Sequence, residues 1–188
     1  MIRTFIAIDL PLPVRNALDE IEKELRKTEA AVSWVKPDRI HLTLKFLGDV
    51  SPERIVDIQA ALREVAAGVS TFRLQPMGCG AFPTIKQMRV VWVGLRGDGE
   101  ALGKLQKEVE AATAYLGFKP EDRSFQAHLT LGRVRGKHNQ RALREALTAL
   151  QTFEAEAFDV TELVLYKSEL RREGALYTPL FRAPIGSR

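Results

Sequence analysis

The phrase His41-Leu42-Thr43-Leu44 recurs later in the chain as His128-Leu129-Thr130-Leu131. The chain contains three histidines, and two of them lie in this repeated phrase. Residues i and i+2 of an extended strand point to the same face. Each copy therefore places an imidazole beside a hydroxyl on one face, while its two leucines turn toward a core. If the two strands come together, two imidazoles and two hydroxyls surround a single space.

Alternating strand and helix patterns surround both copies of the phrase. Proline at a first helical position and short polar N-cap residues indicate helix starts at Pro13, after Ser51 and at Asp98. Leucines at helical spacing predict a fourth helix over residues 143–150. Strands are predicted at 4–10, 34–35, 41–47, 72–77, 89–95, 128–134, 158–166 and 176–181. The order of the elements is typical of a mixed helix and strand protein.

The two halves of the chain match in the order and spacing of these elements. Each motif histidine stands at nearly the same distance from the first strand of its own half. We interpret residues 1–188 as a single domain built by internal duplication, with halves of about 1–78 and 87–188. The segment 77–86, which contains two glycines and a proline, is predicted to connect them.

The composition of the chain indicates which broad class of protein it belongs to. A chain of 188 residues, with 45% hydrophobic and 28% charged residues, is typical of a soluble globular protein. The net charge of +4 favours anionic partners, although a soluble protein can also be basic without such a partner. The single cysteine, Cys79, excludes an internal disulfide and suits a reducing compartment. Because Asp9 interrupts the N-terminus and no long apolar run follows, we expect a cytoplasmic protein without a membrane segment.

Metal binding is one interpretation of the repeated histidines. Zinc sites need three or four Cys, His or carboxylate ligands. Neither phrase contains an acidic residue, and the third histidine, His138, lies between Lys137 and Asn139 in a polar segment that is typical of a solvated loop. We therefore predict neither a metal ion nor another cofactor.

Acid–base catalysis fits the histidines better. An imidazole titrates near neutral pH, so one copy can act as a base while the other acts as an acid. Cleavage of a phosphodiester needs such a pair, and the hydroxyls of Thr43 and Thr130 can donate hydrogen bonds to phosphate oxygens. Nothing in the sequence indicates the Ser or Cys nucleophile, base and orienting acid of a covalent mechanism.

These residues resemble the two-histidine phosphoesterase superfamily, whose mark is a doubled His-x-Thr-x. Within it the chain is most similar to bacterial and archaeal RNA 2′,3′-cyclic phosphodiesterases, also called 2′-5′ RNA ligases. The similarity covers nearly the whole chain. It includes the blocks at 3–11, 41–48, 80–83, 89–94, 125–133, 163–168 and 177–180.

The resemblance implies a bilobal, pseudo-twofold α+β fold in which two mainly antiparallel sheets face a central cleft and helices pack outside. It also implies hydrolysis of a 2′,3′-cyclic phosphate at an RNA 3′ end to a 2′-phosphate, with 2′-5′ ligation as the possible reverse reaction. By this analogy His128 is the general base and His41 the general acid, although the sequence does not distinguish the two roles. Arg133 corresponds to an arginine near the phosphate.

The alternation of side chains along a strand predicts the face on which several other residues lie. It places Arg133 on the leucine face, so the strand has to twist, bulge or end at Gly132 if Arg133 is to reach the phosphate. It places Lys45 with His41, either as cleft charge or as a solvated lysine. Phe5 could stack on a nucleobase, but a core position fits it better, and Trp34 and Trp92 are predicted to pack in the interior.

Three functions remain open on the sequence alone. The first is the RNA 2′,3′-cyclic phosphodiesterase, acting as a monomer. The second is an RNA-binding module that holds 3′ ends without reaction, although neutral imidazoles suit binding less well than arginine or lysine. The third is a related enzyme for another cyclic nucleotide or for 2′-5′ oligonucleotides, since the histidines do not determine the shape of the pocket.

Overall fold

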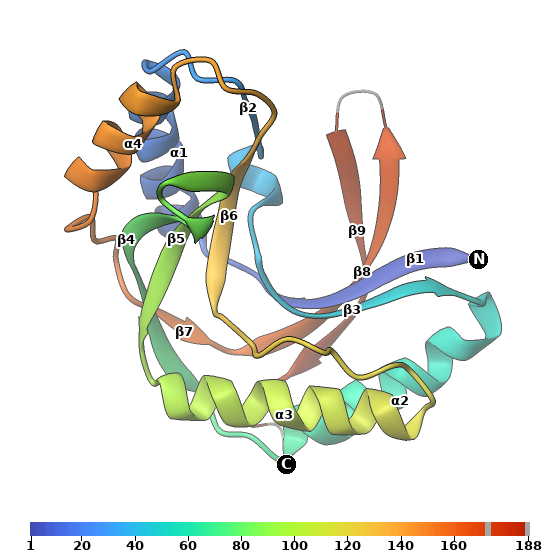
Figure 1. Cartoon of the computed structure of the whole chain (residues 1–188). Coiled ribbons are helices and arrows are strands. Elements are labelled where there is room, and N and C mark those ends of the chain that lie inside the picture. Colours follow the sequence, from blue (N-terminus) through green and yellow to red (C-terminus); the bar gives the residue numbers. More distant parts are fainter. Residues whose placement is uncertain (172–173, 187–188) are drawn as a thin grey trace.

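The computed structural model describes residues 1–171 and 174–186 of the chain. Within these residues, four α-helices and nine β-strands form an α+β fold (Figure 1). The helices are α1 (Leu12–Arg26), α2 (Ile55–Ala67), α3 (Gly99–Tyr115) and α4 (Gln140–Ala149). The strands are β1 (Ile2–Ile8), β2 (Val32–Trp34), β3 (Leu42–Val50), β4 (Phe72–Thr84), β5 (Gln87–Gly97), β6 (His128–Val134), β7 (Phe158–Val160), β8 (Glu162–Arg171) and β9 (Gly174–Pro184).

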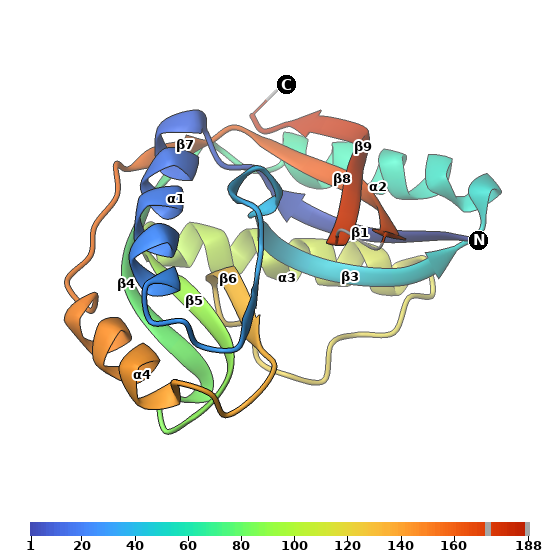
Figure 2. The ribbon, with the colours of Figure 1, turned by 90° about the horizontal axis from the view of Figure 1, so that it is seen from above.

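The strands form two antiparallel sheets, as the family resemblance implied. The first sheet has the order β3-β1-β8-β9, and the second has the order β2-β6-β5-β4-β7. Helices α2 and α3 lie beneath the first sheet, whereas α1 and α4 lie beside the second (Figures 1 and 2). The helices therefore cover the outer faces and leave the region between the sheets to the two motif strands, β3 and β6.

Both halves of the sequence contribute to each sheet. Strand β4 of the first half pairs with β5 in the second sheet, and β8 of the second half pairs with β1 in the first sheet. The orders β3-β1-β8 and β6-β5-β4 correspond when the halves are exchanged. This correspondence supports the predicted internal duplication, which stays a proposal.

The helices follow the apolar spacing of the sequence. In α1 the buried stripe comprises Val14, Leu18, Ile21 and Leu25. Asp98 caps α3 by accepting a hydrogen bond at 3.0 Å from the amide of Ala101. Ser51 occupies the predicted N-cap position, before a short 3₁₀ turn, Pro52–Arg54, that leads directly into α2, but its side chain makes no capping hydrogen bond.

Two predicted strand boundaries also differ from the structure. Strand β4 continues through most of the predicted connector to Thr84, so this segment is one arm of the β4–β5 hairpin. The single strand predicted at 158–166 is two strands: β7 joins the second sheet, and β8 joins the first after Thr161. Apolar patterns alone did not reveal where the chain changes sheets.

The main apolar core spans the contacts between the sheets and the outer helices. Its fully buried members include Ile6, Leu42, Leu62, Leu105 and Leu129. The motif leucines thus lie in the core as predicted, which holds the histidine faces of β3 and β6 in fixed positions. Within the described residues, no helix is both long and apolar enough to cross a membrane.

Candidate active site

A cleft of about 860 Å³ lies between the two sheets and brings the five predicted site residues together. His41, Thr43, His128, Thr130 and Arg133 all line it. Seven of the lining residues are Arg or Lys, whereas none of the described lining residues is Asp or Glu. An anionic ligand in this cleft would therefore meet positive charge without competing carboxylates.

The two imidazoles are anchored in the same way. His41 Nδ1 lies 2.9 Å from the carbonyl oxygen of Arg39, and His128 Nδ1 lies 2.7 Å from that of Gln126. A carbonyl oxygen can only accept a hydrogen bond, so Nδ1 carries the proton in each ring. In the neutral form of each imidazole, Nε2 is then the nitrogen that remains available to accept or return a proton.

Each motif strand contains a β-bulge at the same point of the phrase. Across β1 and β3, Ala7 pairs with Thr43 and Ile6 with Lys45, so Leu44 is the extra residue. Across β5 and β6, Trp92 pairs with Thr130 and the preceding residue with Gly132. A bulge reverses the alternation of side chains beyond it. The residue five positions after each histidine therefore turns to the face of the histidine and threonine.

The bulge in β6 brings Arg133 to the cleft. The sequence placed Arg133 on the leucine face unless the strand bent at Gly132, and the bulge provides that change of direction. A glycine is needed at position 132 because a Cβ there would lie 2.6 Å from Cγ1 of Val32. The close approach of β2 thus explains the residue type beside Arg133.

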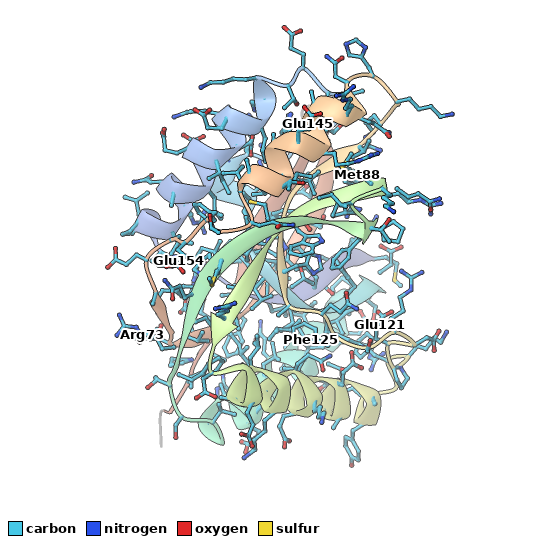
Figure 3. The ribbon with its side chains drawn as sticks, turned by 60° about the vertical axis from the view of Figure 1, so that its left-hand side comes forward. Arg73, Met88, Glu121, Phe125, Glu145 and Glu154 are labelled. Carbon is cyan, nitrogen blue, oxygen red and sulfur yellow. The ribbon has the colours of Figure 1, made fainter. Side chains whose placement is uncertain are left out.

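The same bulge in β3 removes Lys45 from the cleft, so both predicted positions of this lysine were wrong. Lys45 is 3% exposed, and its Nζ donates hydrogen bonds at 2.7 Å to Oε2 of Glu110 and to the carbonyl oxygen of Lys119. Lys119 belongs to the segment that returns from α3 toward β6, in which Glu121 and Phe125 are labelled in Figure 3. The lysine therefore joins β3 to α3 and its following loop.

Phe46 is a cleft residue that the sequence analysis missed. It occupies the position in β3 that Arg133 occupies in β6, it lines the cleft, and it is 61% exposed. An exposed aromatic ring beside basic residues is a surface on which a nucleobase can stack. The signal was the shared spacing of five residues from each histidine, but strict alternation hid it.

The imidazole of His41 is packed against aromatic rings. Its ring stacks on Phe5 with a centroid distance of 4.7 Å and meets the edge of Tyr177 at 5.1 Å. Phe5 is 2% exposed, which confirms its predicted core position. Burial lowers the pKa of His41 to about 4, although the hydrogen bond to the Arg39 carbonyl and the charge of Asp9 oppose this effect.

His128 has a more open setting. The rings of Phe82 and His128 lie nearly perpendicular with centroids 4.9 Å apart, and Phe82 also packs against the half-buried Trp92, in agreement with the predicted packing role of Trp92. Trp34 is also half-buried. It packs against the main core, which confirms its predicted packing role, and it lines the cleft as well.

The remaining candidates lie outside the cleft. His138 is exposed and does not line it. Cys79 is buried, and burial raises the pKa of its thiol to about 12, which does not suit a nucleophile. Within the described residues, no three His, Cys, Asp or Glu side chains are grouped as a metal site would require.

Comparisons with known proteins agree with this geometry. Residues 10–172 match the family model of the 2′-5′ RNA ligase superfamily. The RNA 2′,3′-cyclic phosphodiesterase of Methanothermobacter thermautotrophicus is 35% identical over 179 residues, covering 95% of this chain and 96% of that protein. A Thermus thermophilus crystal structure superimposes with a TM-score of 0.81 at 27% identity, covering 98% of both chains. Escherichia coli LigT complexed with 3′-AMP has a TM-score of 0.77 at 28% identity and 99% coverage of both chains.

Proposed function

The chain belongs to the 2′-5′ RNA ligase superfamily, and from this membership we propose that it is an RNA 2′,3′-cyclic phosphodiesterase. Its proposed reaction is hydrolysis of a 3′-terminal 2′,3′-cyclic phosphate to a 2′-phosphate. The observation that carries this proposal is the pair of imidazoles, each anchored through Nδ1, that line one cleft without a carboxylate among its described residues. Such a pair can move two protons at a bound phosphodiester.

In the proposed mechanism, water attacks phosphorus while His128 Nε2 accepts its proton. The bond between phosphorus and the ribose O3′ breaks, and His41 Nε2 gives its proton to that oxygen. The product has a 2′-phosphate and a free 3′-hydroxyl. Charge that develops on the non-bridging oxygens meets the hydroxyls of Thr43 and Thr130 and the guanidinium of Arg133.

The burial of His41 affects this division of roles. Because its pKa is lowered to about 4, His41 is neutral at pH 7 in the empty cleft, whereas a general acid must be protonated. An anionic phosphodiester bound next to the ring favours the protonated form. We therefore propose that His41 gains its proton as the substrate binds. The opposite assignment, with His41 as the base, is the alternative that its burial favours.

The exposed ring of Phe46 gives the terminal nucleotide a second point of contact. We assign it to stacking on the nucleobase, while Arg133, at the equivalent position of the other strand, contacts the phosphate. The two bulges then place a base-binding group and a phosphate-binding group on opposite walls of the cleft.

The proposed working form is a cytoplasmic monomer that needs neither a metal ion nor another cofactor. Attack by an RNA 5′-hydroxyl in place of water would use the same two histidines and give 2′-5′ ligation. Hydrolysis should continue in EDTA, and light scattering should give the mass of one chain. Loss of activity in EDTA that zinc or manganese restores would contradict the metal-independent mechanism.

The decisive experiment identifies the product. A short RNA that ends in a 2′,3′-cyclic phosphate is incubated with the protein, and the phosphorylated end is identified by chromatography against 2′- and 3′-phosphate standards. We expect the 2′-phosphate. A 3′-phosphate would refute O3′ as the leaving group, and tight binding without turnover would identify the cleft as an RNA-binding site. Faster turnover of another cyclic nucleotide would assign the site to that substrate class.

A further inference from the structure

The cleft extends beyond the reacting groups along the outer edge of the second sheet. Here β2 pairs with β6, and Ser33, Trp34, Lys36 and Arg135 line the cleft. The proposed function does not use these residues, because it assigns the terminal phosphate to Thr130 and Arg133 and the terminal base to Phe46. This part of the cleft is therefore available for another part of the substrate.

The spacing of Arg133 and Arg135 fits two consecutive phosphates. Both side chains are exposed and line the cleft, with the half-buried Val134 between them. Two residues along an extended chain cover roughly 7 Å. This separation is comparable to that of neighbouring phosphates in an extended single strand. If Arg133 contacts the cyclic phosphate, Arg135 is well placed for the next phosphodiester.

The guanidinium of Arg135 is oriented by a neutral partner, so no neighbouring carboxylate in the described part of the chain balances its positive charge. Its Nε donates a hydrogen bond at 2.9 Å to the hydroxyl of Ser33, and none of the ion pairs among the described residues includes Arg135. Arg26, which also lines the cleft, differs because its guanidinium binds the carboxylate of Glu22. A guanidinium that is oriented by a neutral partner retains its remaining donors for a phosphate.

Trp34 follows Ser33 on β2 and adds an aromatic surface to the cleft. Its ring edge packs on β6, where a Cβ at Gly132 would be 3.0 Å from its Cε3 atom. Arg26 lies 5.6 Å from the ring centroid, and the half-buried ring lines the cleft. Aromatic rings next to cations are typical of surfaces that bind single-stranded nucleic acid.

We propose that Ser33, Trp34 and Arg135 form a subsite for the nucleotide on the 5′ side of the cyclic end, with Arg135 bound to the linking phosphodiester. The subsite makes oligonucleotides better substrates than nucleoside 2′,3′-cyclic monophosphates. This inference rests on the proposed function, because it assumes that the terminal nucleotide reacts between the histidines.

The test compares two substrates. One is adenosine 2′,3′-cyclic monophosphate, and the other is the dinucleotide in which two adenosines are joined by a phosphodiester and the 3′ end carries the same cyclic phosphate. We expect the wild-type protein to prefer the dinucleotide at least tenfold in kcat/KM. Arg135→Ala should reduce this preference roughly tenfold, mainly through KM, because a hydrogen bond to a charged group is lost. The slope of log kcat/KM for the dinucleotide against log salt should become shallower by about 0.7, which a purely structural role would not cause.

Two further variants make the comparison specific. Ser33→Ala keeps the charge of Arg135 but removes its hydrogen bond, so it should reduce the preference less than Arg135→Ala does. Arg73→Ala is the matched control, because Arg73 is exposed and projects outward from β4 without lining the cleft (Figure 3). It should leave the preference at the wild-type value.

Three results would overturn the subsite. The wild-type protein could hydrolyse the two substrates equally well, or Arg135→Ala could lower the hydrolysis of both substrates by the same factor. If Arg135→Ala impaired only ligation, Arg135 would be assigned to the RNA strand that carries the attacking 5′-hydroxyl. If the wild-type protein cleaved neither substrate, the proposed function would fail separately. Fluorescence anisotropy with a short RNA ending in a 2′-phosphate would then decide whether Arg135 binds RNA, and equal affinity of wild type and Arg135→Ala would reject the subsite.

Discussion

The two motif strands share one backbone design but place their histidines in different surroundings. At the start of β3 and of β6 the imidazole Nδ1 donates a hydrogen bond to the carbonyl oxygen two residues earlier, and a bulge follows the threonine of each strand. His41, however, is enclosed by Phe5 and Tyr177, whereas His128 meets only the edge of Phe82 among the described rings. A repeated backbone can thus present the same group twice, and the neighbouring side chains can give each copy a different acid–base role.

Removal of either histidine should have the largest effect. His41→Ala and His128→Ala should each lower kcat by about 10²- to 10⁴-fold, because each removes one proton transfer. The kcat of the double variant should be only slightly lower than that of the less active single variant, since the two histidines act as a unit. Single-turnover kinetics with a cyclic-phosphate RNA measure both effects.

His138→Ala is the matched control for these variants, since His138 is exposed and lies outside the cleft. It should keep full activity, and circular dichroism should show that all the variants are folded. If one motif histidine could be removed with little loss, the two strands would not share the reaction.

The residues after the two bulges should differ in the size of their effects. Arg133→Ala should lower kcat by about 10²- to 10³-fold, because it removes a charged donor to the transition state. Phe46→Ala should lower kcat/KM only roughly tenfold, as expected for the loss of one stacked base. Phe46→Tyr keeps the ring and should restore the activity. Equal losses for Arg133→Ala and Phe46→Ala would show that the two positions do not divide phosphate and base contacts.

The residues within the two bulges should affect stability rather than catalysis. Lys45→Met removes the cationic partner of Glu110 and should lower the free energy of unfolding by about 2–4 kcal/mol. Gly132→Ala forces a Cβ against Val32 and should cost about 1–3 kcal/mol. Urea denaturation measures both costs. For Lys45→Met we expect kcat/KM within about twofold of wild type, and a much larger loss would return Lys45 to the active site.

The burial of His41 should also appear in the pH dependence of stability. The usual pKa of 6.5 applies to the unfolded chain, whereas folded His41 titrates at about 4. Between these values the unfolded state binds more protons, so this contribution to stability is present above pH 6.5 and is lost as the pH falls toward 4. Thermal melts at pH 7 and 4.5 should show a smaller loss in His41→Ala than in wild type. An identical loss in the two proteins would contradict the low pKa.

The sequence predicted the parts of the molecule that depend on local patterns. The apolar stripe of α1, the motif strands and the core position of Phe5 follow from spacing and alternation. The bulges did not follow, because register depends on the partner strand, and this dependence led to the wrong position for Lys45 and hid Phe46. The exchange of β4 and β8 between the sheets is also a matter of long-range pairing.

The difference in burial between the histidines had no local signal. Phe5 and Tyr177 lie on β1 and β9, far from His41 in sequence. The doubled phrase therefore identified the reacting pair, but only the assembled sheets indicate how the two copies differ.

The most direct test of this division uses an RNA whose cyclic phosphate has sulfur in place of the 3′ bridging oxygen. A thiolate leaves without needing a proton, so this substrate no longer requires a general acid. We predict that it restores much of the activity of His41→Ala and little of that of His128→Ala. Restoration of His128→Ala instead, or of neither variant, would contradict the assignment of His41 as the acid and His128 as the base.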